Sequence, residues 1–133
     1  MLMLEEQLLL IRACNVTITE SKFQGNSAEI GEAIFATRGA DVMITNSTFG
    51  ENFVTCKTSK NICVGGVLYP FHGEGTMSQN RTQVALSINQ STFWNNTANR
   101  GGVLVALEHT IIKINQSTFW NNTANNCGGF LFY

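Results

Sequence analysis

A repeat of 26 residues is the feature of this sequence that most restricts its fold. Phenylalanines at one position of the repeat are 26, 44 and 26 residues apart, and the segment INQSTFWNNTAN occurs twice without change, at 88–99 and 114–125. The interval of 44 consists of one repeat of 26 and an insertion of 18. Repeats of this length are typical of folds in which each copy stacks on its neighbours. The four phenylalanines are Phe23, Phe49, Phe93 and Phe119.

The same residues surround each phenylalanine. The apolar residues seven and five positions before it are Val16/Ile18, Val42/Ile44, Leu86/Ile88 and Ile112/Ile114. The serines two positions before it are Ser21, Ser47, Ser91 and Ser117, and the asparagines three after it are Asn26, Asn52, Asn96 and Asn122. Glycine-led apolar segments follow at 31–35, 65–69, 101–105 and 128–132. An earlier, degenerate copy aligns Leu8–Arg12 with Ile34–Arg38.

Each copy predicts three short β-strands separated by turns. Alternating apolar residues mark a strand with one buried face, the segment around the phenylalanine marks a second, and the glycine-led segment marks a third. Ser, Asn and Gly interrupt these strands too often for a helix of ordinary length. Because so short a unit cannot bury its apolar face alone, each strand is expected to pair in parallel with its equivalent in the next copy.

Stacking predicts that equivalent side chains lie above one another. The four phenylalanines are expected to form an internal aromatic stack, and the four asparagines a ladder at a turn. Each amide then hydrogen-bonds the next and satisfies turn backbone groups that would otherwise be buried without a partner. The glycines are expected to permit positive φ or close approach of neighbouring coils. These positions are interpreted as structural rather than ligand-binding.

Length and charge limit the chain to one domain and argue against two kinds of partner. The 133 residues form a single domain, 1–133, with copies at roughly 8–33, 34–67, 68–103 and 104–133, the middle two containing the insertion. Only 13% of the residues are charged and the net charge is −1, so there is no basic field for a nucleic acid. No apolar run reaches the roughly 18 to 20 residues that span a bilayer, and no targeting segment is assigned.

The insertion supplies the candidate binding loop. Alignment divides it into about 8 residues before Gly65 and about 10 after Tyr69. Insertions in solenoids lie on the outside, where they often bind ligands. Aromatic and arginine side chains are the usual anchors of recognition surfaces. The candidate binding residues are Tyr69, Phe71, His72 and Arg81. The alternative is an insertion without function.

Cysteine spacing predicts one disulfide and no metal site. Cys56 and Cys63 are close enough in sequence to close a small loop. Cys14 and Cys127 belong to copies about three coils apart, roughly 14 Å along the axis, which is beyond disulfide reach. They are expected to be free or to need partners outside this chain. No CxxC occurs and the two histidines have no ligand-spaced neighbours, so neither zinc nor another cofactor is expected.

Seven N-x-S/T sequons occur, at Asn15, Asn46, Asn80, Asn89, Asn95, Asn115 and Asn121. In a eukaryotic secreted protein these asparagines would be glycan acceptors on an exterior surface. Duplication copies a sequon as readily as any other feature, so the four in the duplicated segments amount to two independent observations.

Two interleaved motifs resemble a known repeat family. The segments FQGN (23–26), FGEN (49–52) and FWNN (93–96, 119–122) alternate with GEAI (31–34), GGVL (65–68, 101–104) and GGFL (128–131). This pattern is similar to the FxxN and GGxx repeats of the chlamydial polymorphic outer-membrane proteins. The resemblance implies a right-handed parallel β-helix of the pectin-lyase-like fold, exposed at a cell surface and associated with adhesion. Glu32, in place of the second glycine, and the insertion depart from the pattern.

Catalysis is the competing interpretation, because many parallel β-helices cleave polysaccharides. Enzymes that resemble pectate lyases or polygalacturonases cluster aspartates, for calcium or for acid and base catalysis, near Arg or Lys. This chain has one aspartate, Asp41, and of its scattered glutamates only Glu6 and Glu32 share a repeat position, without a basic or histidine partner. No catalytic residue is therefore assigned. The alternative function is a segment of a polysaccharide-active enzyme with its catalytic residues elsewhere.

The expected fold class is therefore an all-β, right-handed, single-stranded parallel β-helix, a solenoid of about four coils of 26 residues that is a fragment of a longer rod. The expected function is that of a non-catalytic extracellular or cell-surface module for adhesion or structure. Its expected partners are glycans or cell-surface proteins, and flanking coils or caps of the same chain. Neither a nucleic acid nor insertion of this segment into a membrane is expected.

Overall fold

The computed structural model describes residues 9–12, 14–28, 34–37, 40–54, 68–71, 84–105, 110–128 and 131–132. Every regular element in these ranges is a β-strand, and all strand pairs are parallel. The strands form four sheets, named A to D here, in which five, four, four and four strands lie side by side. The all-β, parallel architecture expected from the repeat is thus present.

The strands of each sheet come from successive copies. Sheet A contains β1 (Leu9–Arg12), β5 (Ile34–Thr37), β9 (Leu68–Phe71), β13 (Leu104–Val105) and β17 (Leu131–Phe132). Sheet B contains β2 (Asn15–Thr19), β6 (Asp41–Thr45), β10 (Val84–Asn89) and β14 (Thr110–Asn115). Sheet C contains β3 (Lys22–Gln24), β7 (Thr48–Gly50), β11 (Thr92–Trp94) and β15 (Thr118–Trp120). Sheet D contains β4 (Ser27–Ala28), β8 (Phe53–Val54), β12 (Thr97–Arg100) and β16 (Thr123–Cys127).

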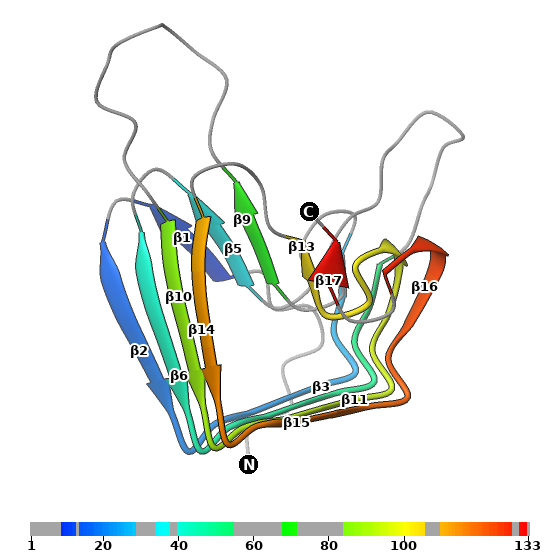
Figure 1. The fold of residues 1–133 in the computed structure, drawn as a ribbon, viewed down its shortest axis with the longest axis horizontal. Helices are drawn as coiled ribbons and strands as arrows, with labels where there is room; N and C mark the ends of the chain where they lie inside the picture. Colours follow the sequence, from blue (N-terminus) through cyan, green and yellow to red (C-terminus); the bar gives the residue numbers. More distant parts are fainter. Residues whose placement is uncertain are drawn as a thin grey trace, which may run out of the picture.

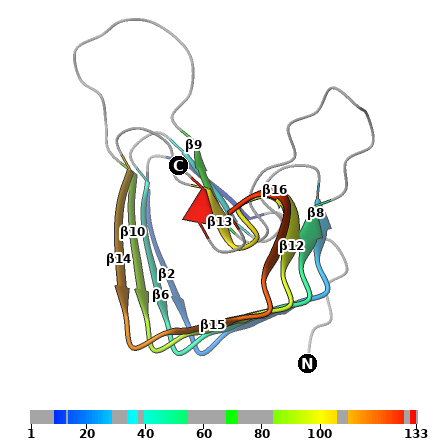
Figure 2. The ribbon, with the colours of Figure 1, turned by 45° about the vertical axis from the view of Figure 1, so that its right-hand side comes forward.

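The chain visits the four sheets in the order A, B, C, D and then returns to A. Figure 1 shows sheet B on the left, sheet C along the base, and the short strands of sheets A and D above it. Each circuit adds one strand to every sheet, and Figure 2 shows the same stacking from another side. A stack of parallel strands buries the apolar face that no single copy could bury.

The register of the sheets follows the repeat. Val42 of β6 faces Val16 on one side and Leu86 on the other. In sheet C, Phe49 likewise faces Phe23 and Phe93. The predicted apolar rows and the predicted phenylalanine row therefore lie in parallel sheets with the predicted neighbours.

The core lies between the sheets. Burial alternates along β10, where Val84, Leu86 and Ile88 are buried and the residues between them are partly exposed. This alternation is what a strand with one interior face requires. The principal core cluster comprises Ile18, Ala40, Val42, Ile44, Phe49, Val84, Leu86, Ile88, Phe93, Val103 and Leu104. Burial decreases in the last copy, where Ile114 is 40% exposed although its equivalent Ile88 is 1% exposed.

The corners between sheets B and C, and between C and D, use the left-handed backbone region. The non-glycine residues with positive φ are Glu20, Asn46, Glu51, Gln90, Asn95, Gln116 and Asn121. Gly25 occupies the corresponding C–D corner in the first copy. L-residues other than Asn and Asp rarely adopt this region. The glutamates and glutamines at these corners therefore show that neighbouring coils, rather than local propensity, impose the turn.

The structure differs from the sequence analysis at two places. Each copy has a fourth strand, in sheet D, where three strands per copy were predicted. The residues of β12 and β16 are mostly polar, so they lack the apolar alternation that marks a strand. In sheet A, Leu9 rather than Leu8 pairs with Ile34, so the alignment of the degenerate first copy was wrong by one residue.

Candidate functional site

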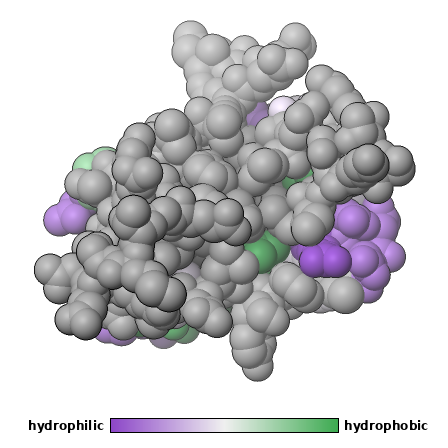
Figure 3. Space-filling model, turned by 90° about the horizontal axis from the view of Figure 1, so that it is seen from above, coloured by the Kyte–Doolittle hydropathy of each residue, from purple (hydrophilic) through white to green (hydrophobic). Residues whose placement is uncertain are grey.

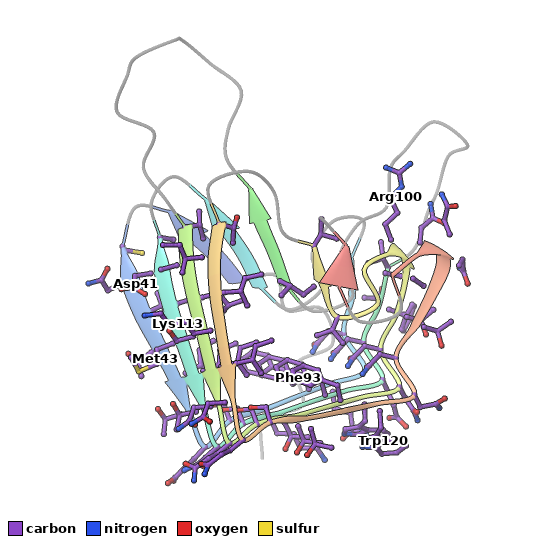
Figure 4. All side chains as sticks on the ribbon, in the orientation of Figure 1. Asp41, Met43, Phe93, Arg100, Lys113 and Trp120 are labelled. Atoms are coloured by element: carbon purple, nitrogen blue, oxygen red, sulfur yellow. The ribbon has the colours of Figure 1, made fainter. Side chains whose placement is uncertain are left out.

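The four phenylalanines of sheet C form a continuous stack inside the molecule. Consecutive ring centroids are 4.7, 4.8 and 4.8 Å apart and the ring planes are within 10° of parallel. Phe49 and Phe93 are fully buried. Figure 4 shows Phe93 pointing into the interior from the base. The separation equals the spacing of paired strands, so the stack follows directly from the register.

The four asparagines that follow the phenylalanines form an amide ladder, in which the first three are buried and Asn122 is partly buried. At each step the Oδ1 atom of one asparagine accepts hydrogen bonds from the backbone N–H (3.1 Å) and the Nδ2 atom (2.9 Å) of the asparagine in the preceding copy. The Nδ2 atoms of Asn52, Asn96 and Asn122 also donate to the phenylalanine carbonyl of the preceding copy, at 3.3, 3.1 and 3.0 Å. The ladder thus satisfies backbone groups at a buried corner.

The serines form a second ladder, whose hydrogen bonds the sequence analysis did not specify. The Oγ atoms of Ser47, Ser91 and Ser117 each accept the backbone N–H of the serine in the preceding copy, at 3.2 Å. Each serine hydroxyl also donates to the carbonyl two residues earlier, at 2.8 to 2.9 Å. Its signal in the sequence was the recurrence of serine at one repeat position. The recurrent interior residues therefore hold the coils together.

The described carboxylates do not gather into a catalytic or metal-binding group. Asp41, Glu20 and Glu51 are exposed, and Glu51 accepts a hydrogen bond from Gln24 Nε2 at 2.7 Å. The described part of the chain has no group of three His, Cys, Asp or Glu side chains arranged to hold a metal ion. Glu6 and Glu32, as well as His72 and His109, lie outside the described residues.

Two of the candidate binding-loop residues belong to a strand. Tyr69 and Phe71 are in β9, where they pair with Phe35 and Thr37 of β5. Tyr69 is the last residue of the predicted glycine-led strand 65–69, whereas Phe71 was assigned to the loop and belongs to the same strand, which ends at Phe71. The loop assignment of Phe71 was therefore wrong, and the role of these residues in binding stays a prediction. His72 and Arg81 lie outside the described residues.

The cysteines are described in part. Cys14 is exposed and free. Cys127 ends β16, where its backbone lies opposite Arg100 of β12 after a register irregularity. Cys56 and Cys63, the predicted disulfide, lie outside the described residues.

Six of the seven sequon asparagines fall within the described residues, and Asn80 lies outside them. Two pairs of these asparagines form short external ladders. Asn115 Nδ2 donates to Asn89 Oδ1 at 3.1 Å, and Asn121 Nδ2 donates to Asn95 Oδ1 at 2.6 Å. Asn15, Asn46, Asn115 and Asn121 are exposed, whereas Asn89 and Asn95 are partly buried.

A pair of tryptophans covers part of the outer face of sheet C. Trp94 and Trp120 face away from the phenylalanine stack, and their rings stack with centroids 5.6 Å apart and planes 11° from parallel. Figure 4 shows Trp120 below the base, outside the interior. The indole of Trp94 leans across the neighbouring strand onto Gly50, since a Cβ atom at Gly50 would overlap Trp94 Cε2. Trp120 is 50% exposed.

Sequence analysis did not single out these tryptophans. Their signal was the duplicated FWNN segment, in which phenylalanine was assigned to the interior and the next residue must face outward. Trp120 is the largest exposed aromatic side chain of the described residues, whereas Trp94 is partly buried.

Four other large apolar side chains of the described residues are exposed, and these are Met43, Phe53, Ile111 and Ile114. Figure 3 shows hydrophilic residues on the right-hand side, where Figure 1 places β16. No helix among the described residues is long and apolar enough to cross a membrane. Comparisons with protein-family models, with curated proteins and with solved structures give no match.

Proposed function

We propose that the chain is a segment of right-handed parallel β-helix. The circuit through four parallel sheets, with one strand added to each sheet per copy, supports this proposal. Connections between parallel strands of one sheet are right-handed in roughly 98% of cases, which favours the right-handed form. The resemblance of the FxxN and GGxx motifs points to the same fold. An experimental structure of the purified chain tests it, and left-handed circuits would contradict it.

We further propose that this segment is a non-catalytic extracellular or cell-surface module that acts in adhesion or as a structural rod. The observation that carries the proposal is that the interior side chains of the strands contact one another, whereas the outward side chains do not form the core. Phe, Ser and Asn of the interior are engaged by their equivalents in the next copy. Only the exterior is left for recognition, and its described carboxylates are dispersed. Such an arrangement suits binding better than acid and base catalysis.

The purified chain, immobilised on beads, tests this proposal against cultured cells, extracellular matrix and arrayed glycans. Saturable binding is expected, with no cleavage of polygalacturonate or other polysaccharides when reducing ends or unsaturated products are measured. Cleavage would support the alternative, a polysaccharide-active enzyme. Absence of both binding and cleavage would leave a rod without a ligand and would refute the adhesive role.

A further inference from the structure

We propose that Trp94 and Trp120 form an external platform that binds the apolar face of sugar rings in a neutral glycan. This inference rests on the proposed binding function and names a ligand class and a surface for it. The platform is distinct from the insertion, because it lies on β11 and β15 of sheet C.

The position of the rings favours recognition. Trp94 is partly buried against Gly50, which fixes its indole, whereas Trp120 stacks on Trp94 and remains half exposed. Stacked indoles that are held by a neighbour need little ordering when a ligand binds, so little conformational entropy is lost. Tryptophan also provides a large apolar face and is enriched among residues that contribute most to binding.

The two segments that carry the platform are polar and uncharged. Thr92 and Thr118 precede the tryptophans by two residues and therefore share their outward face. Asn95 and Asn121 follow the tryptophans directly and form an external amide pair. The segments 90–98 and 116–124 contain no charged residue. Hydroxyl and amide groups both donate and accept hydrogen bonds, as sugar hydroxyls require.

This chemistry selects a neutral sugar among the possible ligands. A nucleic acid or an acidic polysaccharide needs cationic groups, which these two segments lack. A cationic ligand on an indole face would gain from nearby carboxylates. The two segments have none, and the carboxylate of Glu51, whose backbone N–H donates to Trp94 O, already accepts a hydrogen bond from Gln24 Nε2. The C–H groups on one face of a pyranose can instead pack on the indole while the ring hydroxyls reach the flanking Thr and Asn side chains.

Intrinsic fluorescence tests the proposal directly, because the chain has two tryptophans and both belong to the platform. The full chain is produced in bacteria, so that no N-glycan is attached at Asn95 or Asn121. Hexaoses of β-linked glucose, xylose and N-acetylglucosamine, followed by an array of other neutral oligosaccharides, are the probes. At least one of them is expected to shift or quench the emission in a saturable manner.

Three variants separate the platform from other causes of binding. Trp120→Ala is expected to weaken binding of the active oligosaccharide at least about tenfold, without loss of the far-UV circular dichroism of the fold. Gly50→Ala keeps both indoles but removes the space that Trp94 occupies, so it should also weaken binding. Met43→Ala, at a side chain that is 49% exposed on sheet B, is the control and should bind as the parent does.

The outcomes distinguish the tryptophan platform from the proposed adhesive function of the whole segment. If no neutral oligosaccharide changes the emission, or if Trp120→Ala binds as tightly as the parent, the platform is refuted. Cell binding that survives Trp120→Ala, together with unchanged oligosaccharide binding by that variant, would refute the platform and leave the adhesive module standing. Oligosaccharide binding by the platform without any cell or matrix binding would refute the adhesive module alone.

Discussion

Replacement of Asn96 by alanine should destabilise the protein by about 3–6 kcal/mol, because three buried groups lose a partner at about 1–2 kcal/mol each. Asn96 is fully buried in the middle of the amide ladder. Its Oδ1 atom accepts from the N–H and Nδ2 groups of Asn52, and its Nδ2 atom donates to Phe49 O and Asn122 Oδ1. Without the side chain, both Asn52 donors and the Phe49 carbonyl lose these bonds. Asn122 Oδ1 keeps the backbone N–H of residue 96.

Urea unfolding followed by circular dichroism and by tryptophan emission measures this cost, provided that the two transitions coincide. Asn96→Asp separates hydrogen bonding from packing. Aspartate has the same shape and keeps both acceptor bonds from Asn52, but it places a carboxylate oxygen against Phe49 O and Asn122 Oδ1. It should therefore cost at least as much as alanine.

Asn89→Ala is the matched control, because Asn89 belongs to an external pair that water can replace. It should change the free energy of unfolding by no more than about 0.5 kcal/mol. The reasoning fails if Asn96→Ala costs less than about 1 kcal/mol, or if Asn96→Asp is as stable as the parent.

Three further predictions concern stability and covalent structure. Phe93→Ala should lower the free energy of unfolding in urea by about 3–5 kcal/mol, because the ring is fully buried. Phe53→Ala, at a ring that is 44% exposed, should cost much less. Equal costs would argue against the phenylalanine stack as the core. Ser91→Ala should lower the free energy of unfolding by about 1–2 kcal/mol, because its Oγ atom accepts from Ser47 N–H and donates to Asn89 O. If the variant is as stable as the parent, the serine ladder does not stabilise the fold. In oxidising conditions Cys56 and Cys63 should form a disulfide that stabilises the folded state by about 2.5 kcal/mol on the loop-closure model. Peptide mapping without reduction detects the bond, and two free thiols would contradict the prediction.

The repeat made the parallel stack and most of its neighbours predictable. A position that recurs as Phe or Asn in every copy must meet its own equivalent once the copies stack, so the rows through Phe93 and Asn96 followed from spacing alone. The same reasoning failed for β1, whose pairing is offset by one residue. Leucine occupies positions 8, 9 and 10, so apolar pattern alone does not define the register there.

Other features depend on contacts that a single copy does not reveal. The strands of sheet D are short and mostly polar, and only their neighbours in the stack make them strands. The left-handed corners at Glu20 and Gln90 have no local signal, since neither residue type favours positive φ. The outward tryptophans were overlooked for a related reason, because their importance depends on one lying beside the other and on the absence of a side chain at Gly50.

Duplication has a particular consequence in a stacked fold. When the segment INQSTFWNNTAN is copied into the next coil, every outward residue acquires an identical neighbour on the adjacent strand. Interior residues are constrained to keep their identity, as the phenylalanine row shows in all four copies. The residue that follows each phenylalanine faces outward and does change, from Gln24 to Gly50 to Trp94 and Trp120. A single exposed tryptophan thus becomes a stacked pair without any change to the core. Binding surfaces in this chain can therefore arise by copying one coil, and the platform of Trp94 and Trp120 is the place where that has happened with aromatic side chains.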